Sequence, residues 1–178
     1  GNTVGGNLAR PCDGISVAGS SSLKPHIVGN TIENIDLDAI YVSGSAIIEN
    51  NRIRDGYRVY LYYAQGCELR GNVLIETSLD TQVANATIEQ NTIVDASVFL
   101  GLGSFTRNLA YRSEIHCTLG IVLSCNDSWG AAINYSGACA DAPGQNGNSA
   151  VDPQFCGISG SGNYQLQSDS PCAPGNHP

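Results

Sequence analysis

Charged residues are scarce in this sequence, and lysine is almost absent. Asp, Glu, Lys and Arg make up 13% of the 178 residues, the net charge is −8, and Lys24 is the only lysine. A protein that binds DNA or RNA needs cationic side chains to neutralise phosphates, and attachment to an anionic membrane needs them as well. The composition therefore predicts no nucleic-acid partner.

Long apolar runs and methionine are missing too. No stretch approaches the ~20 consecutive apolar residues of a membrane span, so we expect no membrane insertion. Because the chain has no Met, even at its start, we expect a signal peptide or a larger N-terminal segment to precede residue 1 in the primary translation product.

Cysteine, glycine and small polar residues are abundant by comparison. Seven Cys and 21 Gly accompany many Asn, Ser and Thr. Such a composition is typical of proteins that fold in oxidising surroundings, where disulfides persist. We therefore expect an extracellular or cell-surface location, and the length indicates a single domain.

An asparagine recurs at intervals of about 20 residues, a period typical of a solenoid. The repeated positions are Asn2, Asn30, Asn51, Asn72, Asn91, Asn108 and Asn126. Aliphatic residues stand two places after and three places before most of them, with polar residues between, which is the alternation of a β-strand. The pattern predicts an all-β, parallel β-helix of about six rungs over residues 1–129, with rungs about 4.8 Å apart.

Each rung is expected to contain a second inward-facing strand. Its apolar pairs are Ile15/Val17, Ile40/Val42, Leu61/Tyr63 and Leu100/Leu102. The repeated asparagine is expected at the turn between strands, because Asn tolerates left-handed backbone better than other non-glycine residues. Its side chains should also form a ladder of amide hydrogen bonds from rung to rung. The predicted ladder contains Asn30, Asn51, Asn72, Asn91, Asn108 and Asn126.

Repeats such as VGNTIEN and EQNTIVD resemble those of the secreted right-handed parallel β-helix proteins, the pectate-lyase-like superfamily. The later segments LSCNDSWG, GQNGN, VDPQFC and NYQLQSDSPCAPGN are similar to the closing segment of uncharacterised bacterial β-helix repeat proteins. The resemblance covers residues 1–175 and implies a right-handed coil. It implies no single activity, because the superfamily includes lyases, hydrolases, adhesins and inert scaffolds.

After Gly130 the periodicity fades into Gly-, Asn- and Pro-rich sequence with one late strand, NYQLQ. Residues 130–178 are therefore expected to form an irregular C-terminal cap, stapled by disulfides and packed on the last rungs. Candidates for these disulfides are Cys117, Cys125, Cys139, Cys156 and Cys172. Cys156 and Cys172 flank the late strand and are expected to pair, whereas the order among the other three stays open.

Two further cysteines fall outside that set. Cys67 shares an inward column with Ala46 and Ala86, so we expect a buried thiol. Cys12 lies about five rungs, on the order of 24 Å, from the C-terminal cysteines. A disulfide spans only ~4.4–6.8 Å between Cα atoms, which excludes that pairing within one molecule. The motif GNTV at 1–4 repeats GNTI at 29–32, so the first rung is expected to be open, either because copies stack head to tail or because the segment is trimmed or excised. If copies stack, Cys12 becomes a candidate for an intermolecular disulfide.

No catalytic constellation or metal-binding motif stands out, and the histidines are isolated. One exterior column of carboxylates, Asp55, Glu76 and Asp95, follows the repeated asparagine by four places. Stacked about 4.8 Å apart, these groups are suited to hold calcium or to act on a sugar. The alternative is a solvated turn edge. We expect no resident cofactor, with calcium as the one candidate ion.

The segment DGYRVYLYYAQG at 55–66 carries the strongest binding pattern. A strand that points Leu61 and Tyr63 inward directs its other tyrosines outward. Exposed rings suit sugar rings or a partner protein, unless a neighbouring loop or subunit covers them. The candidate ligand-binding residues in this region are Tyr41, Tyr57, Arg58, Tyr60 and Tyr62.

Three functions are compatible with these features. The first is a non-catalytic extracellular β-solenoid that acts as a structural or adhesive unit and stacks end to end into fibres on other copies of itself. The second is a polysaccharide lyase or glycoside hydrolase, or a fragment of one, as the superfamily implies. The third is a carbohydrate-binding module, based on the tyrosines, with extracellular polysaccharide as its partner. The absence of a catalytic pattern favours the first.

Overall fold

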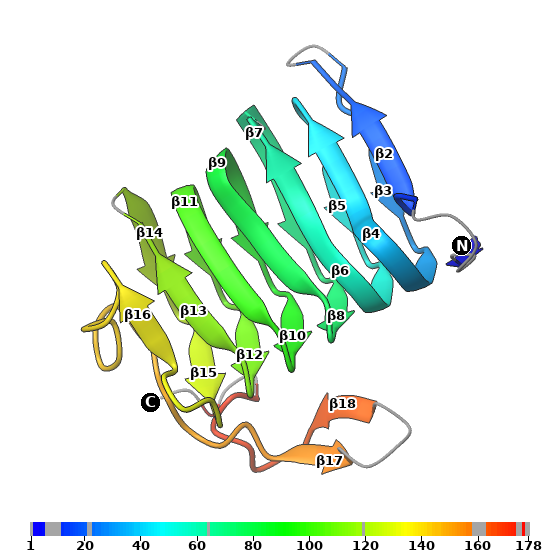
Figure 1. The fold of residues 1–178 in the computed structure, drawn as a ribbon. Coiled ribbons are helices and arrows are strands. Elements are labelled where there is room, and N and C mark those ends of the chain that lie inside the picture. Colours follow the sequence, from blue (N-terminus) through cyan, green and yellow to red (C-terminus); the bar gives the residue numbers. More distant parts are fainter. Residues whose placement is uncertain are drawn as a thin grey trace.

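The computed structural model describes residues 2–5, 12–20, 23–63, 65–118, 120–157, 163–173 and 176. Within these ranges the chain forms 18 β-strands and no helix, and hence no helix that could cross a membrane. Sixteen strands belong to one sheet, which winds into a solenoid of about six turns (Figure 1). The predicted all-β parallel β-helix is therefore confirmed.

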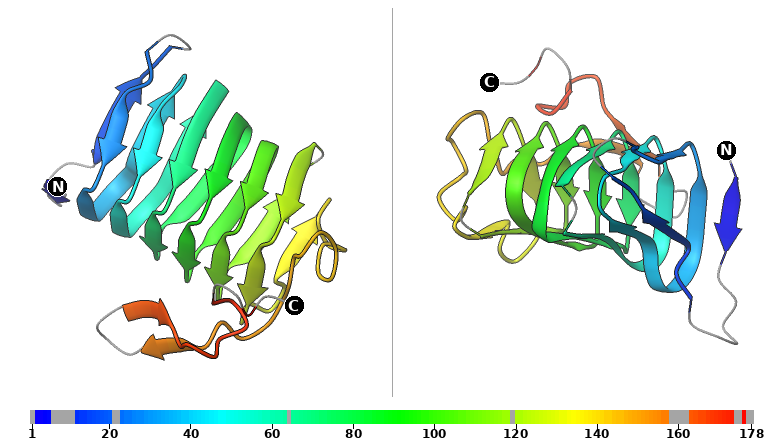
Figure 2. Two further views of the ribbon diagram at one scale, coloured as in Figure 1. Left: turned by 180° about the vertical axis from the view of Figure 1, so that it is seen from behind. Right: turned by 90° about the horizontal axis from the view of Figure 1, so that it is seen from above.

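The winding sheet has three faces, which Figure 2 shows from behind and from above. The first face contains β1 (Thr3–Gly5), β8 (Val73–Ile75), β10 (Thr92–Val94), β12 (Leu109–Tyr111), β15 (Asp127–Trp129) and the first parts of β4 (Thr31–Ser43) and β6 (Arg52–Tyr62). The second face contains the ends of β4 and β6, the first parts of β9 (Ser78–Glu89) and β11 (Ser97–Thr106), and β2 (Ile15–Ala18), β13 (Glu114–Cys117) and β16 (Tyr135–Gly137). The third contains the ends of β9 and β11, and β3 (His26–Val28), β5 (Ile47–Glu49), β7 (Gln65–Arg70) and β14 (Ile121–Ser124).

Equivalent residues lie over one another in successive coils. Ile53 is in register with Ile32 on one side and with Leu74 on the other, and all three side chains are fully buried. Stacking of this kind places every second side chain of each strand in one continuous apolar core. The apolar surface of these side chains is thereby removed from water, which stabilises the fold. The aliphatic positions predicted around the repeated asparagines supply most of that core.

The asparagine ladder is present, and every one of its inner amides is buried. Oδ1 of Asn72 accepts hydrogen bonds from both N and Nδ2 of Asn51, and Nδ2 of Asn72 donates to the carbonyl of Ile48. Asn91 repeats the arrangement with the asparagine of the next coil. A buried amide is costly unless its donors and acceptors are satisfied, and here they are satisfied by the neighbouring coils.

The predicted left-handed backbone of these asparagines is wrong. Positive φ belongs instead to the residue before each one, for example Asn50 (55°), Gln90 (57°) and Arg107 (55°). The ladder side chain must point into the coil to reach its partners, so the preceding residue makes the turn. Asparagine is therefore required at this site for its amide, and its tolerance of left-handed backbone is not used.

Two side chains predicted to point inward lie outside. Tyr63 is 63% exposed, because β6 ends at Tyr62 and Tyr63 adopts a left-handed turn with φ of 47°. Leu102 is 50% exposed, because the register between β9 and β11 shifts after Leu100. A bulge or a turn of this kind reverses the alternation of a strand.

The regular coil continues past residue 129. Strand β16 pairs with β13, and Asn148 extends the ladder by accepting hydrogen bonds from N and Nδ2 of Asn126. The pair Gly147–Asn148 repeats the Gly–Asn pairs at 29–30 and 71–72, and this pattern is visible in the sequence. A hairpin follows, formed by β17 (Phe155–Gly157) and β18 (Asn163–Leu166), and it lies beside the first face (Figures 1 and 2).

The cysteine predictions hold only in part. Cys117 on β13 and Cys139 of the next coil form a disulfide with a Cα–Cα distance of 5.5 Å. Cys67 is a buried thiol, as expected. The predicted pairing of Cys156 with Cys172 is wrong, because Cys156 is exposed on the hairpin whereas Cys172 is half-buried beside Asp127. Cys125 is also a thiol, exposed at a left-handed turn.

Candidate functional site

A cluster of tyrosine rings covers the outward side of the second face, at the ends of β4 and β6. Tyr41 and Tyr60 are in register on these strands, with ring centroids 5.9 Å apart. The ring of Tyr62 lies 6.3 Å from that of Tyr41, nearly parallel to it, and 5.6 Å from that of Tyr60. Tyr63, which the sequence had placed in the core, adds an edge-to-face contact at 4.6 Å with Tyr62. We call these four residues the tyrosine cluster.

Arg58 stabilises one side of the cluster. Its guanidinium lies over the ring of Tyr60, 3.8 Å from the centroid, and 5.3 Å from that of Tyr57. Such a stacked cation is attracted by the ring quadrupole. Burial and the carboxylate of Asp80 together raise the pKa of Tyr60.

Two carboxylates hold that guanidinium in place. Nε of Arg58 donates to Asp38 at 2.7 Å, and Nη1 donates to Asp80 at 3.1 Å. Partial burial alone would lower the pKa of Arg58, but the hydrogen bond and charge of Asp38 raise it above its ordinary value. Neither carboxylate was among the predicted site residues, because their proximity to Arg58 depends on the stacking of three coils.

Exposure is uneven within this region. Tyr41 and Tyr60 are half-buried, whereas Tyr62 is 38% and Tyr57 64% exposed. One face of Tyr60 is covered by Arg58, so Tyr62 and Tyr63 offer most of the accessible ring surface. Flat apolar rings with carboxylates and a guanidinium around them can pack against the C–H face of a sugar and accept or donate hydrogen bonds to its hydroxyls.

The carboxylate column lies on a different part of the molecule, at the turn that follows the first face. Asp55, Glu76 and Asp95 all have left-handed backbone, with φ of 51°, 50° and 53°. A hydrogen bond with Asp55 and the charge of Asp55 raise the pKa of Glu76. Asp55 also pairs with Arg54 at 3.2 Å, and Asp95 pairs with Arg112.

Within the described residues, no group of three or more His, Cys, Asp or Glu side chains is arranged to hold a metal ion. The three carboxylates of the column are not such a group, and calcium binding there stays a prediction. Their arrangement instead provides acidic groups at a strained turn, partly paired with arginines. A second column, Glu49, Arg70 and Glu89, alternates in charge and forms ion pairs at 3.8 and 3.0 Å. Exposed pairs of this kind stabilise a fold only weakly.

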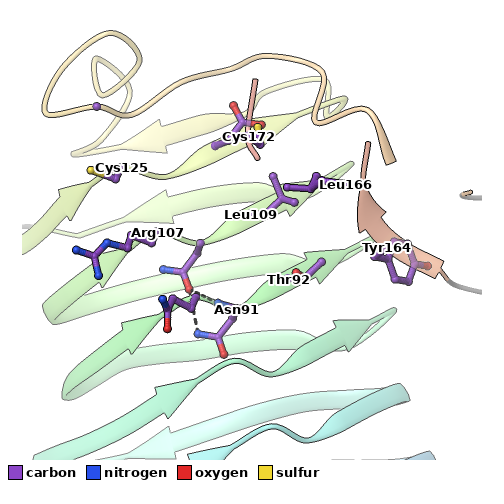
Figure 3. A pocket seen from close by; sticks show the side chains of 12 residues that line it. Asn91, Thr92, Arg107, Leu109, Cys125, Tyr164, Leu166 and Cys172 are labelled. Carbon is purple, nitrogen blue, oxygen red and sulfur yellow. Dashed lines mark hydrogen bonds between the residues drawn. The ribbon is translucent and has the colours of Figure 1, made fainter. Parts of the chain in front are cut away.

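A groove of about 740 Å³ lies between the first face and the hairpin (Figure 3). Thr92 and Leu109 form its floor, in register on β10 and β12, and Tyr164 and Leu166 of β18 form one wall. Asp127 also lines it and is 3% exposed; its Oδ1 accepts hydrogen bonds from Ser149 and from the backbone of Val151. Its Oδ2 accepts none from nitrogen or oxygen.

The thiol of Cys172 is the neighbour of that carboxylate. Burial and the carboxylate of Asp127 raise the pKa of Cys172 to about 12, which keeps the thiol protonated. A thiol is a weak hydrogen-bond donor, so this contact only partly satisfies Asp127. Because Oδ2 is buried beneath its neighbours, it is not presented to a ligand in the groove.

Comparison with known proteins agrees with the coil geometry. The chain matches the family described as "Right handed beta helix region" over residues 2–168. No curated protein and no solved structure is significantly similar to it. Because the match spans nearly the whole chain and the strands stack in parallel with like residues over like, the chain belongs to the right-handed β-helix family.

Proposed function

We propose that this chain is a non-catalytic, extracellular β-solenoid of the pectate-lyase-like superfamily that acts as an adhesive unit. It binds extracellular polysaccharide through the tyrosine cluster. The observation that carries the proposal is the outward platform of Tyr41, Tyr60 and Tyr62, whose ring centroids lie 5.6–6.3 Å apart on a rigid parallel sheet. A rigid aromatic surface loses little conformational entropy when a ligand covers it.

The polar groups around the rings favour a sugar over an apolar protein surface. Asp38 and Asp80 present carboxylate oxygens beside Arg58, and all three are partly exposed. A protein partner that buried these charges without pairing them would pay a desolvation penalty. Sugar hydroxyls can instead donate to the carboxylates while the ring lies on Tyr62.

Affinity electrophoresis through gels that contain polysaccharides, followed by a glycan array, tests this function. We expect retardation of the wild-type protein by at least one polysaccharide, and loss of about 1–2 kcal/mol of binding free energy in Tyr62→Ala. Trp129→Ala is the matched control, because Trp129 is 39% exposed but lies on the first face. Equal effects of the two substitutions, or no binding to any polysaccharide, would contradict the proposal.

The enzymatic alternative is tested with the same ligands. We expect no release of reducing ends or unsaturated products over long incubation. Cleavage that disappears in Asp55→Ala or Glu76→Ala would replace the adhesive function by an enzymatic one.

End-to-end association is a second part of the proposed structural role. Among the described strands, β14 pairs with β11 alone, so its other edge has no strand partner. The thiol of Cys12 is exposed, as a covalent link between copies requires. Negative-stain microscopy and non-reducing electrophoresis of native material test this role. Dispersed single particles, and monomers only, would refute it.

A further inference from the structure

The tyrosine cluster continues along the solenoid axis as a row of outward side chains. Tyr41, Tyr60 and Asp80 are in register on β4, β6 and β9, and Phe99 and His116 follow on β11 and β13. All five are half-buried. Parallel strands lie about 4.8 Å apart, so the four spacings from Tyr41 to His116 span about 19 Å. We call these five residues the axial row.

Phe99 and His116 form a second aromatic platform at the far end of the row. Their ring centroids are 5.9 Å apart, at an interplanar angle of 57°. Nδ1 of His116 lies 2.9 Å from Oγ of Ser136, and that hydroxyl in turn contacts Glu114. The imidazole is therefore fixed in orientation by its neighbours, as the ring of Tyr60 is by Arg58.

Charge on this face is predominantly negative. Among the described residues beside the axial row, three carboxylates, those of Asp38, Asp80 and Glu114, accompany one guanidinium, that of Arg58. Arg58 already directs Nε and Nη1 to two of these carboxylates. An anionic ligand on the axial row would meet an excess of like charge, because the guanidinium of Arg58 is already paired with carboxylates.

We propose that the axial row binds an uncharged, extended glycan, which lies along the solenoid axis from the tyrosine cluster to Phe99 and His116. This inference rests on the proposed polysaccharide-binding function and adds the ligand's charge and the second contact site. Sugar rings pack on the two aromatic platforms, and their hydroxyls donate to Asp80 between them. Asp38 and Asp80 act as specificity-determining residues that disfavour uronates.

Two matched pairs of polysaccharides test the charge of the ligand. One pair is polygalacturonate and its methyl ester, and the other is carboxymethyl cellulose and hydroxyethyl cellulose. For a backbone that binds, we expect the acidic form to bind at least about tenfold more weakly at low salt, and the difference to shrink at high salt. Equal or stronger binding of the acidic form would overturn the inference and leave the proposed function intact.

Asp80→Asn provides the positive test of the specificity determinant. Removal of one unit charge should reduce the acidic-to-neutral ratio of dissociation constants by about fivefold. Asp38→Asn should act in the same direction, whereas Asp152→Asn, an exposed carboxylate on the chain segment before β17, should leave the ratio unchanged. An unchanged ratio in both of the first two variants would overturn the assignment.

Phe99→Ala tests the length of the row. We expect about tenfold weaker binding of the neutral polymer and no change for a disaccharide of the same sugar, which covers the tyrosine cluster alone. Trp129→Ala again serves as the control. If Phe99→Ala leaves polymer binding unchanged while Tyr62→Ala weakens it, the second platform is refuted and the tyrosine site remains. Failure of every polysaccharide to bind would refute the proposed function as well.

Discussion

Asn72 accepts two hydrogen bonds from Asn51 of the preceding coil, one from the backbone N–H at 2.9 Å and one from Nδ2 at 3.0 Å. The same amide donates to the carbonyl of Ile48 and to Oδ1 of Asn91. One side chain thus connects three successive coils. The relationship explains why an asparagine recurs at this position, directly after the residue that makes the turn.

Asn72→Ala should destabilise the fold severely. The substitution leaves the buried N–H and side-chain amide of Asn51 without their acceptor, and each buried unsatisfied group costs about 1–3 kcal/mol. Asn30→Ala is the graded control, because Asn30 lies near one end of the ladder and is only half-buried. Urea denaturation should show the larger loss for Asn72→Ala. Equal losses would indicate that the inner amides contribute no more than the outer one.

Loss of the disulfide should cost about 3 kcal/mol of unfolding free energy, the value expected for a closed loop of this length. Cys117 and Cys139 are separated by 22 residues and join two neighbouring coils near the C-terminal end of the stack. The double variant Cys117→Ala, Cys139→Ala therefore tests it by chemical denaturation. Cys156→Ala should change stability by no more than about 0.5 kcal/mol, because its side chain is exposed.

The thiols should differ widely in reactivity. Burial raises the pKa of Cys67, and the pKa of Cys172 is raised to about 12, so neither forms the reactive thiolate near pH 8. Cys12, Cys125 and Cys156 are exposed. Brief alkylation of the folded protein followed by peptide mapping should label these three, and labelling after unfolding should add Cys67 and Cys172. A disulfide-linked peptide containing Cys156 and Cys172 would contradict the structure.

The carboxyl of Glu76 should titrate above its ordinary range. Its pKa is raised chiefly by the hydrogen bond with Asp55 and by that neighbour's charge. The pKa of the Glu76 carboxyl is higher in the folded protein than in the unfolded chain. The stabilisation that its protonated form contributes to the fold is therefore present at low pH and is lost as pH rises through the folded pKa. Asp55→Asn should therefore lower the pKa of Glu76 in an NMR titration.

Asp95→Asn is the control for that titration, because Asp95 contributes least to the raised pKa of Glu76. Its effect should be smaller than that of Asp55→Asn. A larger shift of the Glu76 pKa in Asp95→Asn would show that Glu76 interacts more strongly with Asp95 than with Asp55, which would contradict the structure.

The parallel β-helix follows directly from the sequence, because a solenoid is specified by its period. Once the coils repeat at nearly constant length, stacking like over like places Ile32, Ile53 and Leu74 in one core column and Asn51 over Asn72. No long-range information beyond the repeat is needed. The clustering of Tyr41 with Tyr60 was predictable for the same reason.

Only the tertiary structure decided the features that depend on departures from that period. A left-handed turn at Tyr63 and a register shift after Leu100 reversed the direction of side chains that strict alternation places inside. The enclosure of Arg58 by Asp38 and Asp80 requires three strands to be aligned at once. The sequence by itself determined the coil and its core, because both arise from local repetition. Which distant polar groups meet depends on loop lengths and turns, and their effect on side-chain positions appears only when the chain is folded.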